Sequence, residues 1–189
     1  MMTFDWKWKV SEAMERLRSR YEFIGRSTGA PFLALVYPPE AEAAFLREWH
    51  TVAAGLSPEF AINTVNVLDL TQETVGEIGA DNIVSAIADP MPGSDPASDL
   101  GAAWITRIAD AVRNAVRHTT SPKPVVVLER LAALFPVAGP REVMQHLWDD
   151  PTAAPESPVV VLIPGHLRTP RTYSFLGQRE EFMYRGDLL

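Results

Sequence analysis

One stretch of this 189-residue sequence has the residue types and spacing of a catalytic motif. Gly25-Arg26-Ser27-Thr28-Gly29 fits the G-x-S-x-G pattern of serine hydrolases. That chemistry requires the serine on a sharp turn from a strand into a helix, beside an oxyanion hole. Here a predicted helix precedes the motif and a predicted strand follows it. We therefore interpret residues 25–29 as the end of a helix followed by a loop.

A nucleotide-binding protein of this class would have a phosphate-binding loop after the first strand of its parallel sheet. A phosphate-binding loop has glycine amides there, followed by a lysine and a hydroxyl residue. In this chain the turn reads Tyr37-Pro38-Pro39-Glu40. The two prolines lack an N–H donor, and Glu40 would repel a phosphate. Glu129 follows a predicted strand, as an ATPase acidic residue does, but we expect it to be a structural carboxylate near solvent.

Metal and thiol chemistry find no support in the sequence. The chain has no cysteine, which excludes disulfides, thiolate zinc sites and cysteine nucleophiles. Its four histidines are far apart, and none lies in an H-E-x-x-H frame. They are His50, His118, His146 and His166. We therefore assign no catalytic residue, no metal ligand and no cofactor to this chain.

The segment from Pro164 to Leu189 interleaves arginines with aromatic residues. This composition is typical of protein interfaces and of single-stranded nucleic-acid sites. Glu180, Glu181 and Asp187 cancel most of the positive charge, and the whole chain carries a net charge of −7. Both facts favour protein contact over nucleic acid. The residues predicted to form a protein-contact surface are Pro164, Gly165, Arg168, Phe175, Gly177, Tyr184 and Arg185.

An alternative reading of the same residues is structural. Pro164, Gly165 and Gly177 would then shape turns, and the aromatic side chains would belong to the core, because aromatic residues dominate cores as well as interfaces.

Helices and strands alternate along the chain. Apolar steps of three and four from Val10 to Ile24 predict a helix, and Phe32–Tyr37 is an apolar run of strand length. Further strands are predicted over 65–69, 125–128 and 159–163, with a short fifth over 182–185. The third and fourth are apolar throughout, so we expect both of their faces to be buried.

These elements predict one domain, residues 1–189, with a three-layer α/β fold. It has a mostly parallel sheet of about five strands flanked by helices, in a P-loop-NTPase-like layout without a phosphate-binding loop. Ser11 and Thr71 are the expected helix caps, and the helix after Thr71 is expected to reach Ile87. The proline-rich stretch 89–98 is expected to be a loop.

Two further features of the sequence indicate the cellular compartment. No apolar run approaches the ~20 residues of a membrane span. Residues 1–7 lack the basic and apolar regions of a signal peptide. We therefore expect a cytoplasmic protein without membrane contact.

Segments in the C-terminal half look like those of a known family. Val125–Pro136 resembles a strand that runs into a "gxxaLyPf" segment, and Pro158–Gly165 resembles a "P-hhh-FYPG" strand and turn. Ser174–Gly177 and Met183–Gly186 correspond to "L-x-L-F-G" and "Y-Y-R-A".

The N-terminal half continues the likeness in the same order. Ala30–Phe32, with Tyr37–Glu40 and Arg47, is similar to an "IPF…dYdPxdE…R" opening, and Val67–Leu70 matches a second-strand ending. Over nearly its whole length the chain thus resembles the BrxB family of bacteriophage-exclusion (BREX) systems. It would be a divergent member, with Ile163 where the family usually has tyrosine.

The resemblance implies a role in resistance to phage. It also implies two partners, a PglZ-like protein and a large ATPase, so that nucleic acid would be met only indirectly through the complex. No catalytic residue is carried over from the family. We expect a non-catalytic adaptor. Two alternatives stay open: a divergent nucleotide hydrolase or nuclease with a spatially assembled site, and a nucleic-acid-binding module that uses the C-terminal arginines.

Overall fold

The computed structural model describes residues 6–121, 123–152 and 154–189. Its centre is a parallel sheet with the strand order β2-β3-β4-β1-β7. The strands are β1 (Phe32–Tyr37), β2 (Ala61–Asn66), β3 (Pro124–Glu129), β4 (Val159–Thr169) and β7 (Asp187–Leu188). The expected three-layer α/β fold with a mostly parallel sheet is confirmed. Residues 1–5, part of the segment tested for a signal peptide, lie outside the described residues.

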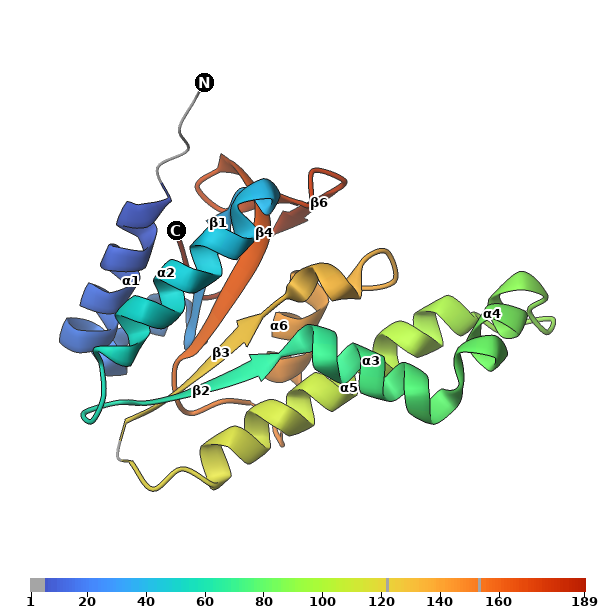
Figure 1. Cartoon of the computed structure of the whole chain (residues 1–189), viewed down its shortest axis with the longest axis horizontal. Helices are drawn as coiled ribbons and strands as arrows, with labels where there is room; N and C mark the ends of the chain where they lie inside the picture. Colours follow the sequence, from blue (N-terminus) through green and yellow to red (C-terminus); the bar gives the residue numbers. More distant parts are fainter. Residues whose placement is uncertain (1–5, 122, 153) are drawn as a thin grey trace.

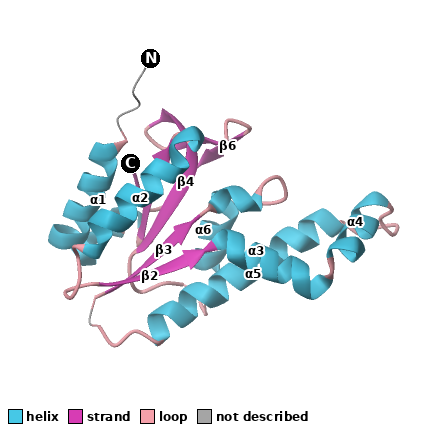
Figure 2. Cartoon of the chain, viewed as in Figure 1, coloured by secondary structure: helices cyan, strands magenta, loops and turns pink. Residues whose placement is uncertain are grey.

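Helices cover both faces of the sheet (Figures 1 and 2). α1 (Lys7–Arg20) and α2 (Glu42–Ala54) pack on one face. α5 (Pro96–Arg117) and α6 (Pro140–Asp149) pack on the other. Within β1, Leu33 faces α1 and α2 whereas Ala34 faces α5 and α6, because successive side chains of a strand point to opposite faces. The apolar runs 125–128 in β3 and 159–163 in β4 are buried on both faces, as predicted.

β4 continues beyond the parallel sheet into an antiparallel hairpin. From Gly165 onward it pairs with β5 (Thr172–Phe175), which pairs with β6 (Arg179–Phe182). The prediction of a strand over 182–185 is wrong, because strand pairing ends at Phe182. Gly186, with a φ of 90°, then redirects the chain so that β7 lies parallel to β1.

A helical arm, residues 67–106, extends away from the sheet (Figure 1). It consists of α3 (Val67–Ile78), α4 (Ala80–Ala88) and the first half of α5. The expected strand over 65–69 is only partly correct, because β2 ends at Asn66 and α3 begins there. The Asn66 side chain accepts hydrogen bonds from the amides of Leu68 and Asp69, so Asn66 rather than Thr71 is the cap.

Other helix boundaries also differ from the sequence patterns. The helical segment does reach Ile87, but Gly79, with a φ of 93°, divides it into α3 and α4. Ser11 lies inside α1, whose N-cap position is Trp6. α5 begins within the expected loop 89–98, because Asp95 caps it and Pro96 is tolerated in a first turn. The part of the chain that the structure describes also has four short 3-10 helices: η1 (Tyr21–Phe23), η2 (Arg26–Thr28), η3 (Pro39–Ala41) and η4 (Leu131–Leu134).

Candidate functional site

The carboxyl edge of the parallel strands is where α/β sheets most often bind ligands. Glu129 ends β3 at this edge, and its Oε2 lies 2.7 Å from the Nε2 of His50 on α2. The Glu129 side chain is buried, so the expectation of a carboxylate near solvent is corrected. A buried carboxylate requires a partner, and the histidine supplies it.

The end of β1 at the same edge is filled by a buried tyrosine. The Tyr37 hydroxyl donates a hydrogen bond to Glu42 Oε1 at 3.0 Å, and its ring stacks on Phe45 with centroids 4.1 Å apart. Burial first, and then the Glu42 carboxylate, raise the pKa of the Tyr37 phenol. The turn that follows runs through Pro38 and Pro39 into η3. These prolines leave two positions of the turn without an amide donor.

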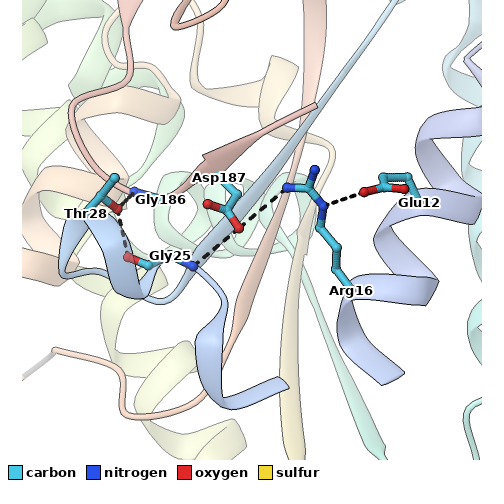
Figure 3. Close-up of polar contacts among 6 residues, drawn as sticks. All are labelled: Glu12, Arg16, Gly25, Thr28, Gly186 and Asp187. Atoms are coloured by element: carbon cyan, nitrogen blue, oxygen red, sulfur yellow. Dashed lines mark hydrogen bonds and ion pairs between the residues drawn. The ribbon is translucent and has the colours of Figure 1, made fainter. Parts of the chain in front are cut away.

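The serine-hydrolase-like loop, residues 25–29, forms hydrogen bonds with residues that precede and begin β7 (Figure 3). Thr28 Oγ1 donates to the carbonyl of Gly25 at 2.8 Å and accepts from the amide of Gly186 at 2.5 Å. Asp187 Oδ2 accepts from the Gly25 amide and lies 3.5 Å from Arg16 Nη1, which links the same loop to α1. The loop therefore holds β7 against the sheet, and Ser27 takes no part in these bonds.

The four histidines occupy separate positions. His50 meets Glu129, and His118 Nδ1 lies 2.8 Å from the Asn114 carbonyl at the end of α5. His146 is on α6 and His166 is on β4. Within residues 6–121, 123–152 and 154–189, no group of three or more His, Asp or Glu side chains is arranged to hold a metal ion.

Of the seven residues predicted to form a contact surface, three are buried and four are exposed. Pro164, Gly165 and Phe175 are buried, the first two in β4 and the third in β5. A Cβ on Gly165 would meet the Ser174 carbonyl at 2.5 Å, so glycine is required for β5 to approach. These three residues shape the interior and cannot form a surface.

The remaining four predicted contact residues are exposed, and two of them line the same groove. Arg168 is near the end of β4, and Gly177 lies in the turn after β5 with a φ of 70°. Tyr184 and Arg185 lie between β6 and β7, where they line a groove. Of the seven predicted contact residues, Tyr184 and Arg185 are the two that line this groove.

The groove runs between α6 and the segment 182–185, with a volume of about 340 Å³. The Arg185 guanidinium lies 4.6 Å from the ring centroid of Trp148, and that of Arg141 lies 5.3 Å from the ring centroid of Tyr184. Phe182 meets Tyr184 edge to face at 4.7 Å. Each wall thus contributes an arginine that lies near an aromatic ring of the other wall.

A buried carboxylate joins the two walls. Glu181 on β6 accepts a hydrogen bond from the Arg141 amide at 3.0 Å and another from the Tyr173 hydroxyl at 2.6 Å. Burial first, and then the Glu181 charge, raise the pKa of Tyr173, so it stays a donor. Because these bonds are inside the protein, we expect the walls to keep their spacing when the groove binds a ligand.

Sequence reasoning missed half of this groove. It singled out Tyr184 and Arg185 but no residue of α6, although Trp148 and Arg141 on that helix form the opposite wall. A tryptophan in the last turn of a short amphipathic helix was the available signal.

Among the residues that the structure describes, no helix is long and apolar enough to cross a membrane. Comparison of the chain with protein-family models, with curated proteins and with solved structures finds no match.

Proposed function

We propose that this chain is a non-catalytic adaptor that binds other proteins through the groove between α6 and residues 182–185. The observation that carries the proposal is the exposed aromatic and arginine content of that groove. Tyr184 is 66% exposed although it is a large, largely apolar side chain. Tyrosine, tryptophan and arginine are the residues that contribute most binding energy at protein interfaces.

The groove is better suited to a protein than to nucleic acid. Asp149 lines it together with Arg141 and Arg185, so a phosphate backbone would meet a carboxylate as well as two cations. The chain as a whole carries a charge of −7, which opposes the approach of a polyanion.

The biological setting is proposed from the sequence resemblance to the BrxB family. On that basis the chain is a cytoplasmic component of a BREX-like antiphage system, and its partners are a PglZ-like protein and a large ATPase. The absence of phosphate-binding glycines after β1 is compatible with a component that leaves ATP hydrolysis to its partner.

The proposal is tested by affinity capture of the tagged full chain from its native host, with the captured proteins identified by mass spectrometry. We expect the PglZ-like protein or the large ATPase to be recovered, and both Tyr184→Ala and Arg185→Ala to abolish the capture. Arg168→Ala is the matched control, because it removes an exposed arginine outside the groove. Circular dichroism establishes that each variant is folded.

Two results would contradict the proposal. One is capture of the same partners by the wild type and by both groove variants. The other is tight binding of ATP with magnesium that is lost in Glu129→Gln, which would indicate an enzyme instead.

A further inference from the structure

The tip of the helical arm exposes apolar side chains that the described residues leave uncovered. Val84 is 65% exposed, Ile87 is 45% exposed and Met91 is 76% exposed. Val84 and Ile87 lie three residues apart in α4 and so share a face of that helix, and Met91 follows in the segment after it. With Ile78, which is also exposed, they form what we call the arm patch. No residue of α4 is buried, although its sequence, Ala-Asp-Asn-Ile-Val-Ser-Ala-Ile-Ala, is mostly apolar.

The arm is nevertheless an ordered part of the fold. Val75 and Ile83 pack against the core cluster that contains Leu100 and Trp104 of α5. At its base, Arg107 of α5 pairs with Glu77 of α3 at 2.7 Å. The helices that carry the patch are therefore held to the rest of the fold by packing and by an ion pair. Contiguous exposed apolar surface of this kind marks interaction sites.

Charge is distributed unevenly around the patch. Between Arg47 and Arg107 the sequence has no lysine or arginine. Seven of the chain's 24 acidic residues lie in the arm, so the other 17 balance its 17 lysines and arginines, and the arm accounts for the net charge of −7. The seven are Asp69, Glu73, Glu77, Asp81, Asp89, Asp95 and Asp99.

The carboxylates nearest the patch are free to act on a partner. Asp81 lies in the first turn of α4 and Asp89 follows its last residue, so they flank Val84 and Ile87 at both ends. Neither Asp81 nor Asp89 forms an ion pair with another described residue.

We infer that the arm patch docks an amphipathic helix of a partner protein whose apolar stripe is bordered by lysine and arginine. Apolar contact would supply the affinity, and the carboxylates would select basic neighbours and speed the encounter. The same charge repels nucleic acid and anionic membranes. It also opposes pairing of two arms from two copies of the chain. This surface is separate from the groove, so it would give the proposed adaptor a second binding face.

The probe for the test is a labelled synthetic peptide of about 18 residues in which leucine and lysine segregate to opposite helix faces. Its binding to the full chain is followed by fluorescence anisotropy. We expect binding that weakens with salt, and no binding of the same peptide with glutamate in place of lysine. A peptide with the same composition in scrambled order should bind at least about tenfold more weakly.

Variants locate the binding on the arm. The pair Val84→Ser and Ile87→Ser should weaken binding about tenfold or more, because it removes the two large exposed apolar side chains that α4 contributes to the patch. The pair Asp81→Asn and Asp89→Asn should weaken binding and flatten its salt dependence. As matched controls, Phe23→Ser removes an exposed apolar side chain elsewhere, and Glu15→Gln with Glu22→Gln removes two exposed charges. Both should bind as the wild type does.

Three outcomes would overturn the inference. They are unchanged binding in the Val84 and Ile87 variant, equal binding of the glutamate peptide, and a dimer in sedimentation that the same variant dissociates. The Tyr184→Ala variant should still bind the peptide. The Val84 and Ile87 variant and the Asp81 and Asp89 variant should still capture the partners that bind the groove. Failure at one surface is thereby distinguished from failure at the other.

Discussion

The carboxylate of Glu181 closes the N-terminus of α6 by accepting a hydrogen bond from the amide of Arg141 at 3.0 Å. A negative charge at this end of a helix meets unpaired N–H groups and the positive end of the helix dipole. Gly139, just before the helix, makes room for it, since a Cβ there would lie 2.2 Å from Glu181 Oε1. One carboxylate from the C-terminal hairpin thus orients the helix that forms the facing wall of the groove.

Replacing this carboxylate should cost considerable stability. Glu181 is 2% exposed, and Glu181→Ala leaves the Tyr173 hydroxyl and the Arg141 amide without their acceptor. We expect the free energy of unfolding to fall by about 2–4 kcal/mol, measured by urea denaturation. Glu180→Ala, at the exposed neighbouring position, should change it by less than about 0.5 kcal/mol. Equal losses in the two variants would contradict this account of Glu181.

Two glycines with positive φ should respond differently to alanine. Gly186 has a φ of 90°, and a Cβ there would lie 2.6 Å from the Cβ of Phe32. Gly177 has a φ of 70°, and a Cβ there would meet nothing within 4 Å. Gly177→Ala should therefore cost about 1–2 kcal/mol from backbone conformation alone.

The clash at Gly186 adds to the same backbone cost. Gly186→Ala should destabilise the protein by about 2 kcal/mol more than Gly177→Ala does, with loss of amide hydrogen-exchange protection in β7. A smaller effect at Gly186 than at Gly177 would show that β7 is not held as described.

In the loop of Figure 3, we expect substitutions of two adjacent hydroxyl residues to differ in their effect on stability. Thr28→Val keeps the side-chain shape but removes the acceptor of the Gly186 amide, so we expect a loss of about 1–3 kcal/mol in thermal or urea unfolding. Ser27→Ala changes an exposed side chain and should leave stability within about 0.5 kcal/mol of the wild type. A stability loss in Ser27→Ala as large as that in Thr28→Val would refute the structural assignment of this loop.

Lys9 should make stability depend on pH in the alkaline range. Its Nζ donates to the Val36 carbonyl at 2.7 Å, and burial lowers the pKa of its ammonium to about 8. The unfolded chain holds this proton up to about pH 10. Between about pH 8 and 9.5 the unfolded state therefore binds more protons, and the free energy of unfolding rises with pH.

Substitution isolates this effect. In Lys9→Met the rise should disappear, whereas Lys7→Met, which changes an exposed lysine of the same helix, should retain it. Urea denaturation at intervals of about half a pH unit measures the slope. A slope of the wild-type size in Lys9→Met would assign the pH dependence to other groups.

Local patterns identified a substantial part of the candidate site. Tyr184 and Arg185 stood out because aromatic and arginine residues alternate near the C-terminus. Trp148 and Arg141 did not, since the groove joins them to Tyr184 and Arg185 across about forty residues of sequence. The arm patch also escaped notice, because α4 has the composition of a core helix and only its position shows that nothing covers it.

The sequence by itself determined the fold class and the central strands. Strands buried on both faces require unbroken apolar runs, and 32–37, 125–128 and 159–163 have them. It also determined that the turn after the first strand cannot cradle a phosphate with its amides, since proline has no N–H.

Tertiary structure alone decided which polar groups meet. Glu129 was expected near solvent and is buried against His50. Glu181 was noted only for offsetting the charge of the C-terminal arginines, and its side chain is buried. The physical reason is distance along the chain. Local periodicity records which face of an element is apolar, but the partner of a buried charge comes from another element, and only the packing of the elements specifies it.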